Sequence, residues 1–417
     1  MVNFLDLSKK IIPRPIFNFF QPVYHWLMAL AGAIIYRFPS SKIFVLGTTG
    51  TKGKSTTLEL INTILEADKK RTALLSSIRI KIGEKSKKNY SGNTMPGRFF
   101  IQRFLRKAVN TNCQYALIEV TSQGILQYRH RFINWQAAIF TNLAPEHIEA
   151  HGSFEKYRKA KTDFFTYIKN KLFFINKDDA NAKYFTEAAQ DGKIVLYSKN
   201  SLNSKPYTLN PNLIGDFNKE NIAAAIAFIK SQNISETIIK KAIENFQGVP
   251  GRMEFIPAFV KTSAGKQQPF TVVIDYAHTP DSLKNVYETI RNSKLICVLG
   301  SAGGGRDKWK RPEMGKIAAE YCDKIILTNE DPYDEKPLEI LSQIEVGICI
   351  NPRTLARRPA FIYKILNRKE AIKKAISLAK PNDTVIITGK GCESFIHIAG
   401  GKKIPWNERK IVEEIIK

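Results

Sequence analysis

Short apolar runs alternate along the chain with longer stretches that have one polar face. After Lys42 this alternation is typical of mostly parallel α/β sheets. A first group of apolar runs reads IFVLG, YALIEV, AAIFT, LFFIN and IVLYS. A second group reads TVVID, LICVLG, IILT and TVIIT. The pattern therefore predicts two α/β units.

The segment NFQGVPGRMEFI separates the two groups. It is rich in Gly and Pro and has no periodicity, so we place a boundary near Gly251. A length of 417 residues also exceeds one typical domain. We predict an apolar and basic N-terminal segment over residues 1–40, a central domain over 41–250 and a C-terminal domain over 251–417.

A glycine-rich turn follows the first apolar run and reads GTTGTKGKSTT from Gly47. Backbone N–H groups at such a turn, before a helix, bind phosphate, while Lys54 suits the β- and γ-phosphates and Ser55 suits Mg²⁺. Thr48 stands where the strict P-loop pattern has Gly, so the loop is a variant. The predicted ATP-binding residues of this loop are Gly50, Thr51, Lys52, Gly53, Lys54, Ser55 and Thr56.

Polar residues follow two further predicted strands. LIEV contains Glu119 near its end, and FTNLAPEH places His147 after another run. Ligands of open parallel sheets bind at the carboxyl ends of strands, so both residues are expected on the P-loop edge.

The N-terminal segment contains an unusual stretch without Asp, Glu, Lys or Arg between Arg14 and Arg37. Three interpretations remain open: a helix packed on the protein, an interfacial helix and a membrane span. Pro22 and His25 weaken the spanning interpretation. A signal peptide is disfavoured because a P-loop that uses cytoplasmic ATP follows closely.

The charge balance is strongly basic, with a formal net charge of +26. Such a field attracts nucleic acid, anionic membranes or polyanionic small substrates. Part of the excess lies between Lys69 and Lys107, where twelve Lys and Arg residues accompany only Glu84. The five cysteines are scattered and contain no C-x-x-C pair, which indicates neither a zinc site nor a disulfide framework.

Many stretches resemble the Mur ligase family, and most closely its MurE-type branch, which ligates an amino acid to a UDP-N-acetylmuramoyl dipeptide. The resemblance runs from about Lys42 to the C-terminus. It rests on TTGTKGKSTT, NTMPG, EVTSQG, TNLAPEHIEAHG, YRKAK, INKDDAN, GDFNKENIAAA, GVPGRME, DYAHTPDSL, GGGRDKWKRPEM, TNEDP and GKGCE. It implies a P-loop central domain with a mostly parallel sheet and a Rossmann-like C-terminal domain.

The resemblance also implies the chemistry. ATP phosphorylates a carboxylate of the acceptor, and an amino group then attacks the acyl phosphate to form an amide. Two Mg²⁺ ions are implied, one on Ser55 and Glu119 and a second near His147. The YRKAK motif implies that Lys161 is carbamylated, which would turn a cation into a metal-binding anion. Lys54, Glu119, His147 and Lys161 are the implied catalytic residues.

Further binding residues are implied motif by motif. The ATP-binding set gains Asn218, Asn221, Arg252, Asp275 and His278, with Arg252 at the interdomain hinge. The acceptor set is Asn93, Thr94, Ser122 and Arg129. The amino-acid set is Asn329, Asp331, Gly389 and Glu393.

The loop that selects the amino acid departs from the family. Enzymes that take meso-diaminopimelate commonly read D-N-P-R there, whereas Tyr333 replaces the Arg in this chain. Glu330 and Asp331 add negative charge, which suits an ammonium, so we expect a diamino acid such as lysine or ornithine. If meso-diaminopimelate is the substrate, Arg306 or Arg353 would have to bind its distal carboxylate.

The family's N-terminal uridine-binding domain has no counterpart in the roughly forty residues before the P-loop strand. A lipid-linked muramoyl peptide or a folylpolyglutamate-like acceptor is therefore an alternative substrate. A non-catalytic protein that binds nucleotide or nucleic acid, indicated only by the charge, is disfavoured by the intact P-loop. We expect a peptidoglycan-synthesis enzyme in the cytoplasm that uses residues 17–36 at the inner membrane face.

Overall fold

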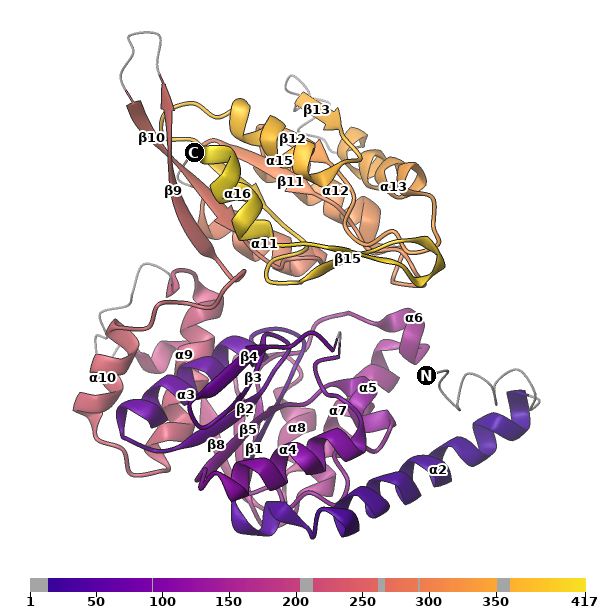
Figure 1. The fold of residues 1–417 in the computed structure, drawn as a ribbon, viewed down its shortest axis with the longest axis vertical. Helices are drawn as coiled ribbons and strands as arrows, with labels where there is room; N and C mark the ends of the chain where they lie inside the picture. Colours follow the sequence, from indigo (N-terminus) through magenta and orange to yellow (C-terminus); the bar gives the residue numbers. More distant parts are fainter. Residues whose placement is uncertain (1–13, 92, 203–212, 262–266, 292, 351–360) are drawn as a thin grey trace. The chain divides into compact units, whose positions relative to one another are not determined.

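The computed structural model describes residues 14–91, 93–202, 213–261, 267–291, 293–350 and 361–417. They form two compact units, each built on its own sheet (Figure 1). Unit 1 comprises residues 1–143, 155–205 and 220–242, and unit 2 comprises 144–154, 206–219 and 243–417. The first thirteen residues of the predicted N-terminal segment, and Arg353, lie outside the described residues.

Unit 1 contains an eight-stranded sheet with the order β4-β3-β2-β5-β1-β6-β7-β8. The strands from β2 to β8 in this order are parallel, and the β2-β3-β4 edge is antiparallel. Their bounds are β1 Phe44–Thr49, β2 Thr72–Leu75, β3 Arg79–Ile82, β4 Lys85–Lys88, β5 Tyr115–Glu119, β6 Ala137–Phe140, β7 Leu172–Asn176 and β8 Lys193–Tyr197. The five apolar runs of the first group are β1, β5, β6, β7 and β8, as predicted.

Helices follow the strands of unit 1. They are α2 Arg14–Ile35, α3 Lys54–Ala67, α4 Arg98–Asn110, α5 Ser122–Leu126, α7 Phe154–Tyr167, α8 Ala182–Ala188, α9 Asp216–Lys230 and α10 Glu236–Glu244. Two of them, α7 and α9, begin in segments of unit 2. Apolar residues at helical spacing explain α3, since Leu58, Ile61 and Leu65 are all fully buried.

Unit 2 contains a six-stranded sheet with the order β13-β12-β11-β14-β10-β9. It is parallel except for the β9-β10 pair. Its strands are β9 Glu254–Lys261, β10 Gln267–Ile274, β11 Leu295–Leu299, β12 Lys324–Leu327, β13 Phe361–Lys364 and β14 Thr384–Ile387. A small hairpin of β15 Phe395–His397 and β16 Lys403–Pro405 accompanies them. The four apolar runs of the second group are β10, β11, β12 and β14, as predicted.

Two apolar layers cover the faces of this second sheet. One layer joins the strands to α11 Pro280–Thr289, α12 Lys310–Tyr321 and α13 Pro337–Cys349. The other joins them to α15 Arg368–Ser377 and α16 Glu408–Ile416. Helices on both faces of a mostly parallel sheet confirm the predicted Rossmann-like arrangement. The remaining helix, α6 Ile148–His151, lies in the short 144–154 segment of this unit.

Helix α2 is the structure of the charge-free stretch. Its Ala29 and Ala33 are buried, and Gly32 lies against the first turn of α4, where an added Cβ would be 3.6 Å from the Phe99 Cα. The opposite face is exposed, including Phe20, Leu27 and Ile34. None of the described helices is long and apolar enough to cross a membrane. Helix α2 therefore has one packed face and one exposed face.

Candidate functional site

The glycine-rich turn forms a compact loop between β1 and α3. Gly50 has φ 148° and Gly53 has φ 80°, both in a region that side chains disfavour. Gly53 is the N-cap residue of α3, and an added Cβ there would lie 2.1 Å from the Asn221 Oδ1. The glycines therefore allow the tight turn and the close approach of α9, as the sequence predicted for a phosphate-binding loop.

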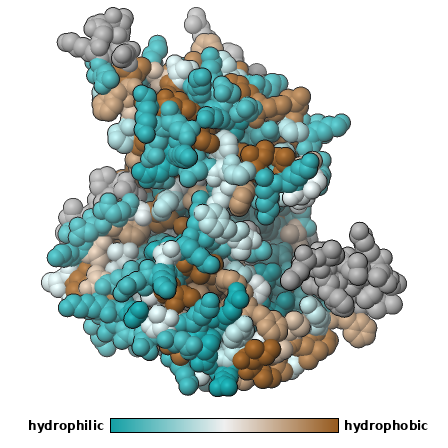
Figure 2. Space-filling view, viewed as in Figure 1, coloured by the Kyte–Doolittle hydropathy of each residue, from teal (hydrophilic) through white to brown (hydrophobic). Residues whose placement is uncertain are grey.

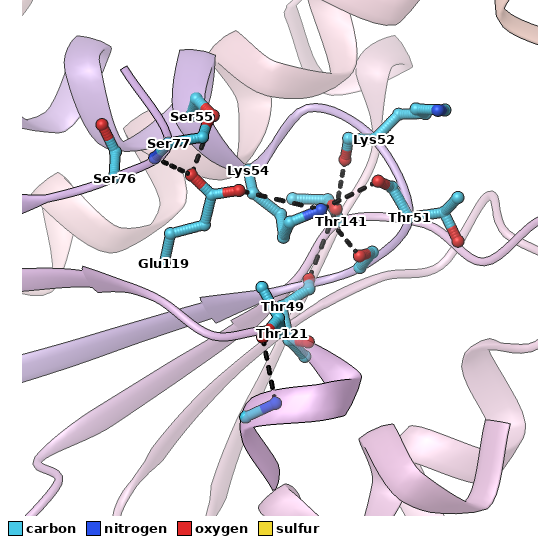
Figure 3. A network of polar contacts seen from close by, with 12 residues as sticks. Thr49, Thr51, Lys52, Lys54, Ser55, Ser76, Ser77, Glu119, Thr121 and Thr141 are labelled. Atoms are coloured by element: carbon cyan, nitrogen blue, oxygen red, sulfur yellow. Dashed lines mark hydrogen bonds and ion pairs between the residues drawn. The ribbon is translucent and has the colours of Figure 1, made fainter. Parts of the chain in front are cut away.

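Glu119 lies beside this loop because its strand β5 pairs with β1, where Thr48 is opposite Glu119. The Ser55 hydroxyl donates to the Glu119 Oε2 at 2.9 Å, and the Ser77 backbone N–H donates to the same oxygen at 3.0 Å. The Lys54 ammonium is 3.9 Å from the other carboxylate oxygen. Figure 3 shows these groups converging on one buried carboxylate.

Residues directly after β6, which pairs with the other side of β1, hold the P-loop in place. Thr141, directly after β6, donates from its hydroxyl to the Lys52 carbonyl at 2.7 Å (Figure 3). The Asn142 backbone carbonyl accepts from the Thr51 backbone N–H, and the Asn142 side-chain oxygen accepts from the Lys52 backbone N–H. These contacts hold the loop backbone in place from the neighbouring strand end.

Lys161 reaches the same loop from α7. Its side chain is 2% exposed, and its ammonium donates to the Gly50 carbonyl at 2.7 Å. Lys54 donates to this carbonyl too, at 3.0 Å. Lys161 also lies over the Tyr157 ring, whose hydroxyl is 3.1 Å from the Thr51 hydroxyl. The structure therefore brings Lys54, Ser55, Glu119 and Lys161 to one loop.

His147 belongs to the 144–154 segment of unit 2 and precedes α6 with a left-handed φ of 57°. In the same segment, Glu146 lies 3.0 Å from the Nε2 of His278. The Glu149 backbone N–H donates to Asp307 at 2.9 Å. The segment is thus held by polar contacts within unit 2.

The two predicted adenine-side residues lie on α9, three positions apart. Asn221 accepts from the Thr57 hydroxyl at 3.3 Å, which ties it to the start of α3. Asn218 donates to the Ile214 carbonyl at 2.9 Å. Asn221 therefore lies at the P-loop, whereas Asn218 belongs to a segment of unit 2.

The predicted hinge residues form one cluster in unit 2. The Asp275 carboxylate accepts from the backbone N–H groups of Met253 and Ala277, each at 2.7 Å. The Arg252 guanidinium stacks over Tyr276, 4.2 Å from the ring centroid. Its Nε is buried without a hydrogen-bond partner among the described residues. Asp275 thus fixes the backbone beside Arg252.

The predicted acceptor residues lie in two segments of unit 1, one directly before α4 and one directly after β5. Ser122 is the first residue of α5 and is buried, while Asn93 is exposed and accepts from Asn89 at 3.1 Å through its carbonyl. Thr94 is half-buried beside it. Arg129 donates to the Gln127 side chain and to the Met95 carbonyl. Met95 follows Thr94 in the NTMPG motif, and Arg129 lies shortly after the EVTSQG motif. Arg129 therefore connects the two segments that contain the predicted acceptor residues.

Two of the predicted amino-acid residues, Asp331 and Glu393, pair with the Lys390 ammonium, which sequence reasoning did not single out. Lys390 has no exposed side-chain surface and pairs with Asp331 at 2.8 Å and with Glu393 at 2.5 Å. Glu393 also accepts from the Tyr276 hydroxyl at 2.9 Å. Asn329 accepts from Arg368 through its carbonyl. The GKGCE motif was the available signal, because its lysine stands between two of the predicted positions.

The acidic loop residues Glu330 and Asp331 are held by contacts within unit 2. Asp331 is bound by Lys390 and by the backbone N–H of His397, so its charge is already matched. Burial raises the pKa of Glu330 to about 7, against an opposing effect of Lys310. Gly389, with φ 103°, leaves room for this carboxyl group. In the described residues Asp331 is thus paired and Glu330 is buried, and their contact with a ligand ammonium stays a prediction.

A metal fits the P-loop set through oxygen ligands. Ser55 supplies a hydroxyl and Glu119 a carboxylate 2.9 Å apart, which is the donor chemistry that Mg²⁺ prefers. The described residues contain no group of three or more His, Cys, Asp or Glu side chains able to hold a metal ion. The protein alone therefore supplies only part of a coordination shell there, as is usual for Mg²⁺ bound together with phosphates.

Comparison with known proteins matches residues 48–229 to the Mur ligase middle domain and residues 251–391 to the Mur ligase, glutamate ligase domain. A UDP-N-acetylmuramoyl-L-alanyl-D-glutamate–2,6-diaminopimelate ligase of Aquifex aeolicus (strain VF5) is 36% identical, over 91% of this chain and 78% of that protein. A ligase of the same name from Syntrophomonas wolfei is 34% identical, over 94% and 81%.

Solved structures show the same fold. A structure with the same 2,6-diaminopimelate ligase name is 26% identical with a TM-score of 0.55, over 90% of this chain and 78% of that one. A folylpolyglutamate synthase of Mycobacterium tuberculosis, complexed with ADP and AMPPCP, has a TM-score of 0.66 at 15% identity, over 87% and 92%. The second likeness shows the fold alone.

The fold and the P-loop define an ATP-dependent amide ligase. The chain belongs to the Mur ligase family, whose members depend on ATP and Mg²⁺.

Proposed function

We propose that this ligase adds a diamino acid to a muramoyl-dipeptide precursor of peptidoglycan through an acyl phosphate. The relatives named as 2,6-diaminopimelate ligases support this substrate class. The single observation that carries the chemistry is the convergence of Lys54, Ser55 and Lys161 around Glu119 and the P-loop. Phosphoryl transfer to a carboxylate crowds anionic oxygens together, and preorganised cations offset that charge.

Each residue of this set has a proposed role. Lys54 binds the β- and γ-phosphates of ATP, with the loop residues 50–56 as backbone donors. Ser55 and Glu119 would hold one Mg²⁺, a second Mg²⁺ would bind near His147, and Lys161, as a carbamate, would serve as a metal ligand. Metal bound there would supply charge neutralisation between the phosphates and the acceptor carboxylate. The buried position of Lys161, with its ammonium at the loop carbonyl, supports a function beyond a surface charge.

The remaining residues have binding roles in the proposal. Asn218, Asn221, Arg252, Asp275 and His278 bind the nucleotide, and Arg252 moves with domain closure. The acceptor residues are Asn93, Thr94, Ser122 and Arg129. The amino acid is bound by Asn329, Asp331, Gly389 and Glu393, of which Glu393 is the partly exposed carboxylate, with 37% of its side chain exposed.

The decisive experiment is phosphate release over a matrix of acceptors and amino acids. The acceptors are a UDP-linked muramoyl dipeptide, a lipid-linked muramoyl peptide and a folate, each with lysine, ornithine, meso-diaminopimelate and glutamate. We expect turnover that requires a muramoyl acceptor and a diamino acid. Turnover with the folate and glutamate alone would overturn the proposed acceptor.

We also propose that this cytoplasmic enzyme contacts an anionic membrane surface through α2. Along its outward face, Phe20, Val23, Leu27, Ile34 and Ile35 are each more than half exposed. Figure 2 shows hydrophobic side chains gathered over the region of α2. A continuous exposed apolar face of this kind marks an interaction site.

The charge of the neighbouring surface supports anionic lipid as the partner. Neither α2 nor its neighbour α4 contains an acidic residue, and Arg103 and Lys107 on α4 are exposed. A second copy of the chain would bring the same basic residues face to face, whereas an anionic lipid surface would attract them.

Co-sedimentation tests this contact with vesicles of phosphatidylglycerol and phosphatidylcholine, against vesicles of phosphatidylcholine alone. We expect binding only to the anionic vesicles and its loss in a Leu27→Glu, Ile34→Glu variant. Leu338→Glu is the matched control, since Leu338 is an equally exposed leucine in unit 2. Dimerisation without lipid that the same variant abolishes would instead identify a second copy as the partner.

A further inference from the structure

Three basic side chains meet beneath α2, apart from the P-loop. Arg98 is the first residue of α4, and its Nε and Nη2 atoms are buried without a hydrogen-bond partner among the described residues. His25 of α2 is 5% exposed, and neither of its ring nitrogens has a partner in the described part of the chain. Arg129 completes the cluster and donates to Gln127 at 2.6 Å and 3.1 Å.

The cluster is electrostatically uncompensated. Burial, with repulsion from Arg129, lowers the pKa of Arg98 to about 10. Burial and the two arginines lower the pKa of His25 to about 4. Over the described residues, no carboxylate forms an ion pair with Arg98 or Arg129. Buried charges without a partner are costly, so they are usually kept where a ligand supplies the opposite charge.

The N-terminal end of α4 adds to this positive potential. The helix has thirteen residues, and its N-cap residue, Gly97, provides no side-chain cap. A Cβ added at Gly97 would meet no atom of the described residues within 4 Å, so none of them fills the space beside this N-cap residue. Uncapped backbone N–H groups and the helix dipole favour an anion at this position.

We infer that His25, Arg98, Arg129 and the N-terminal end of α4 form a binding site for the diphosphate group of the acceptor. This inference rests on the proposed function. Two guanidinium groups and a helix end match a multiply charged anion better than a single carboxylate. The cluster adjoins the proposed acceptor residues, since Arg129 is one of them and Asn93 and Thr94 lie shortly before Arg98.

The consequence is that unit 1 itself can recognise the diphosphate. Both acceptor sources carry the group, because UDP-linked and lipid-linked muramoyl peptides share it. Of the residues that form the site, His25 comes from the helix whose opposite face is proposed to contact lipid. Recognition through the diphosphate requires no contact with uridine.

Kinetics with three acceptors test the site: the UDP-linked muramoyl dipeptide, its lipid-linked form and a muramoyl dipeptide without diphosphate. In Arg98→Gln, KM for the diphosphate-bearing acceptor should rise about 10-fold or more, the usual effect of a lost charge-assisted hydrogen bond. KM for ATP and for the amino acid should not change, and the diphosphate-free acceptor should show no added penalty. Whichever of the UDP-linked and lipid-linked acceptors shows this rise in KM is the acceptor whose diphosphate binds at the site.

Arg71→Gln is the matched control, because Arg71 is an exposed arginine of unit 1 outside α2 and α4. An equal effect of Arg98→Gln on all three acceptors, or no effect, would overturn the inference. Circular dichroism of both variants, together with an Arg98→Lys variant that keeps the charge, separates misfolding from a binding defect.

A binding measurement keeps this inference separable from the proposed function. Pyrophosphate is titrated into the wild-type protein while the His25 ring protons are followed by NMR, with the resonance assigned through His25→Gln. We expect a local shift of the His25 resonance and a higher pKa for its imidazole, both absent in Arg98→Gln. If the wild type turned over none of the acceptors, the proposed function would fail while this titration still decided the anion site. An unchanged His25 resonance would count against the site.

Discussion

The P-loop in unit 1 and the Lys390 cluster in unit 2 both contain buried lysines, but they use them differently. Lys54 and Lys161 both donate to the neutral Gly50 carbonyl, and Lys54 is also 3.9 Å from Glu119, whereas Lys390 pairs closely with two carboxylates. Phosphate oxygens can replace the neutral carbonyl as the hydrogen-bond acceptor of these lysines, and the opposite charges then stabilise each other. The ion pairs of Lys390 must be kept when a ligand binds, or they must be replaced by ligand groups of equal charge. In the proposed function, this difference suits the first site to polyanionic phosphates and the second to a zwitterionic amino acid.

The largest effect should come from removing the P-loop cation. Lys54→Ala should reduce kcat/KM on the order of 10²-fold or more, because a preorganised cation is lost from a phosphoryl-transfer site. Phosphate release measures it, and Lys85→Ala, at an exposed lysine on β4, is the control. Wild-type-like ligation by Lys54→Ala would refute the assigned role.

The second-largest effect should come from removing Lys161. Lys161→Ala should lose about 10²-fold or more in rate, because the proposed carbamate ligand disappears with the amine. A short carboxylic acid added to the assay should restore part of the activity. Lys159→Ala, two residues earlier on α7 with 74% of its side chain exposed, should behave as wild type. A free amine at Lys161 in a metal-bound structure of the active enzyme would contradict the carbamate.

A third prediction concerns stability and the acidic loop. The folded protein keeps the Glu330 proton up to about pH 7, while the unfolded chain releases it near the ordinary value of 4.5. The free energy of unfolding should therefore fall as pH rises from 4.5 to 7 and level off above that. Glu330→Gln should remove about 3 kcal/mol of this fall, since 1.36 kcal/mol corresponds to each pKa unit.

Denaturant unfolding at pH 5 and pH 8 measures this difference. Glu339→Gln, at an exposed glutamate on α13, is the control and should keep the wild-type pH dependence. Equal pH dependence in wild type and Glu330→Gln would show that Glu330 is ionised in the folded protein and available to a ligand.

The smallest effect concerns the choice of amino acid. Tyr333 lacks a guanidinium and stacks on His397, with the ring centroids 5.1 Å apart. We expect kcat/KM for lysine or ornithine to exceed that for meso-diaminopimelate, by about 10-fold if one charge-assisted contact is missing. A much higher value for meso-diaminopimelate, lost in Arg306→Gln, would show that Arg306 binds the distal carboxylate instead.

Nine apolar runs in the sequence predicted nine strands, and all of them except the partly exposed edge strand β8 are buried on both faces of a sheet. The sequence pattern missed β4, which reads KSKK and is mostly exposed at the sheet edge. It also missed β9, which contains Pro257 and adjoins the glycine-rich boundary. Edge strands need few apolar residues, so periodicity alone does not reveal them.

The sequence by itself determined the P-loop and its neighbour Glu119. A glycine-rich turn after a buried strand has few alternative structures, and the carboxyl ends of adjacent parallel strands share one edge. The sequence could not determine the charge state of Glu330, the burial of Lys390 or the cluster of His25 with Arg98 and Arg129. Those depend on residues far apart in the chain, whose burial and mutual distances set their electrostatic energies only once the chain is folded.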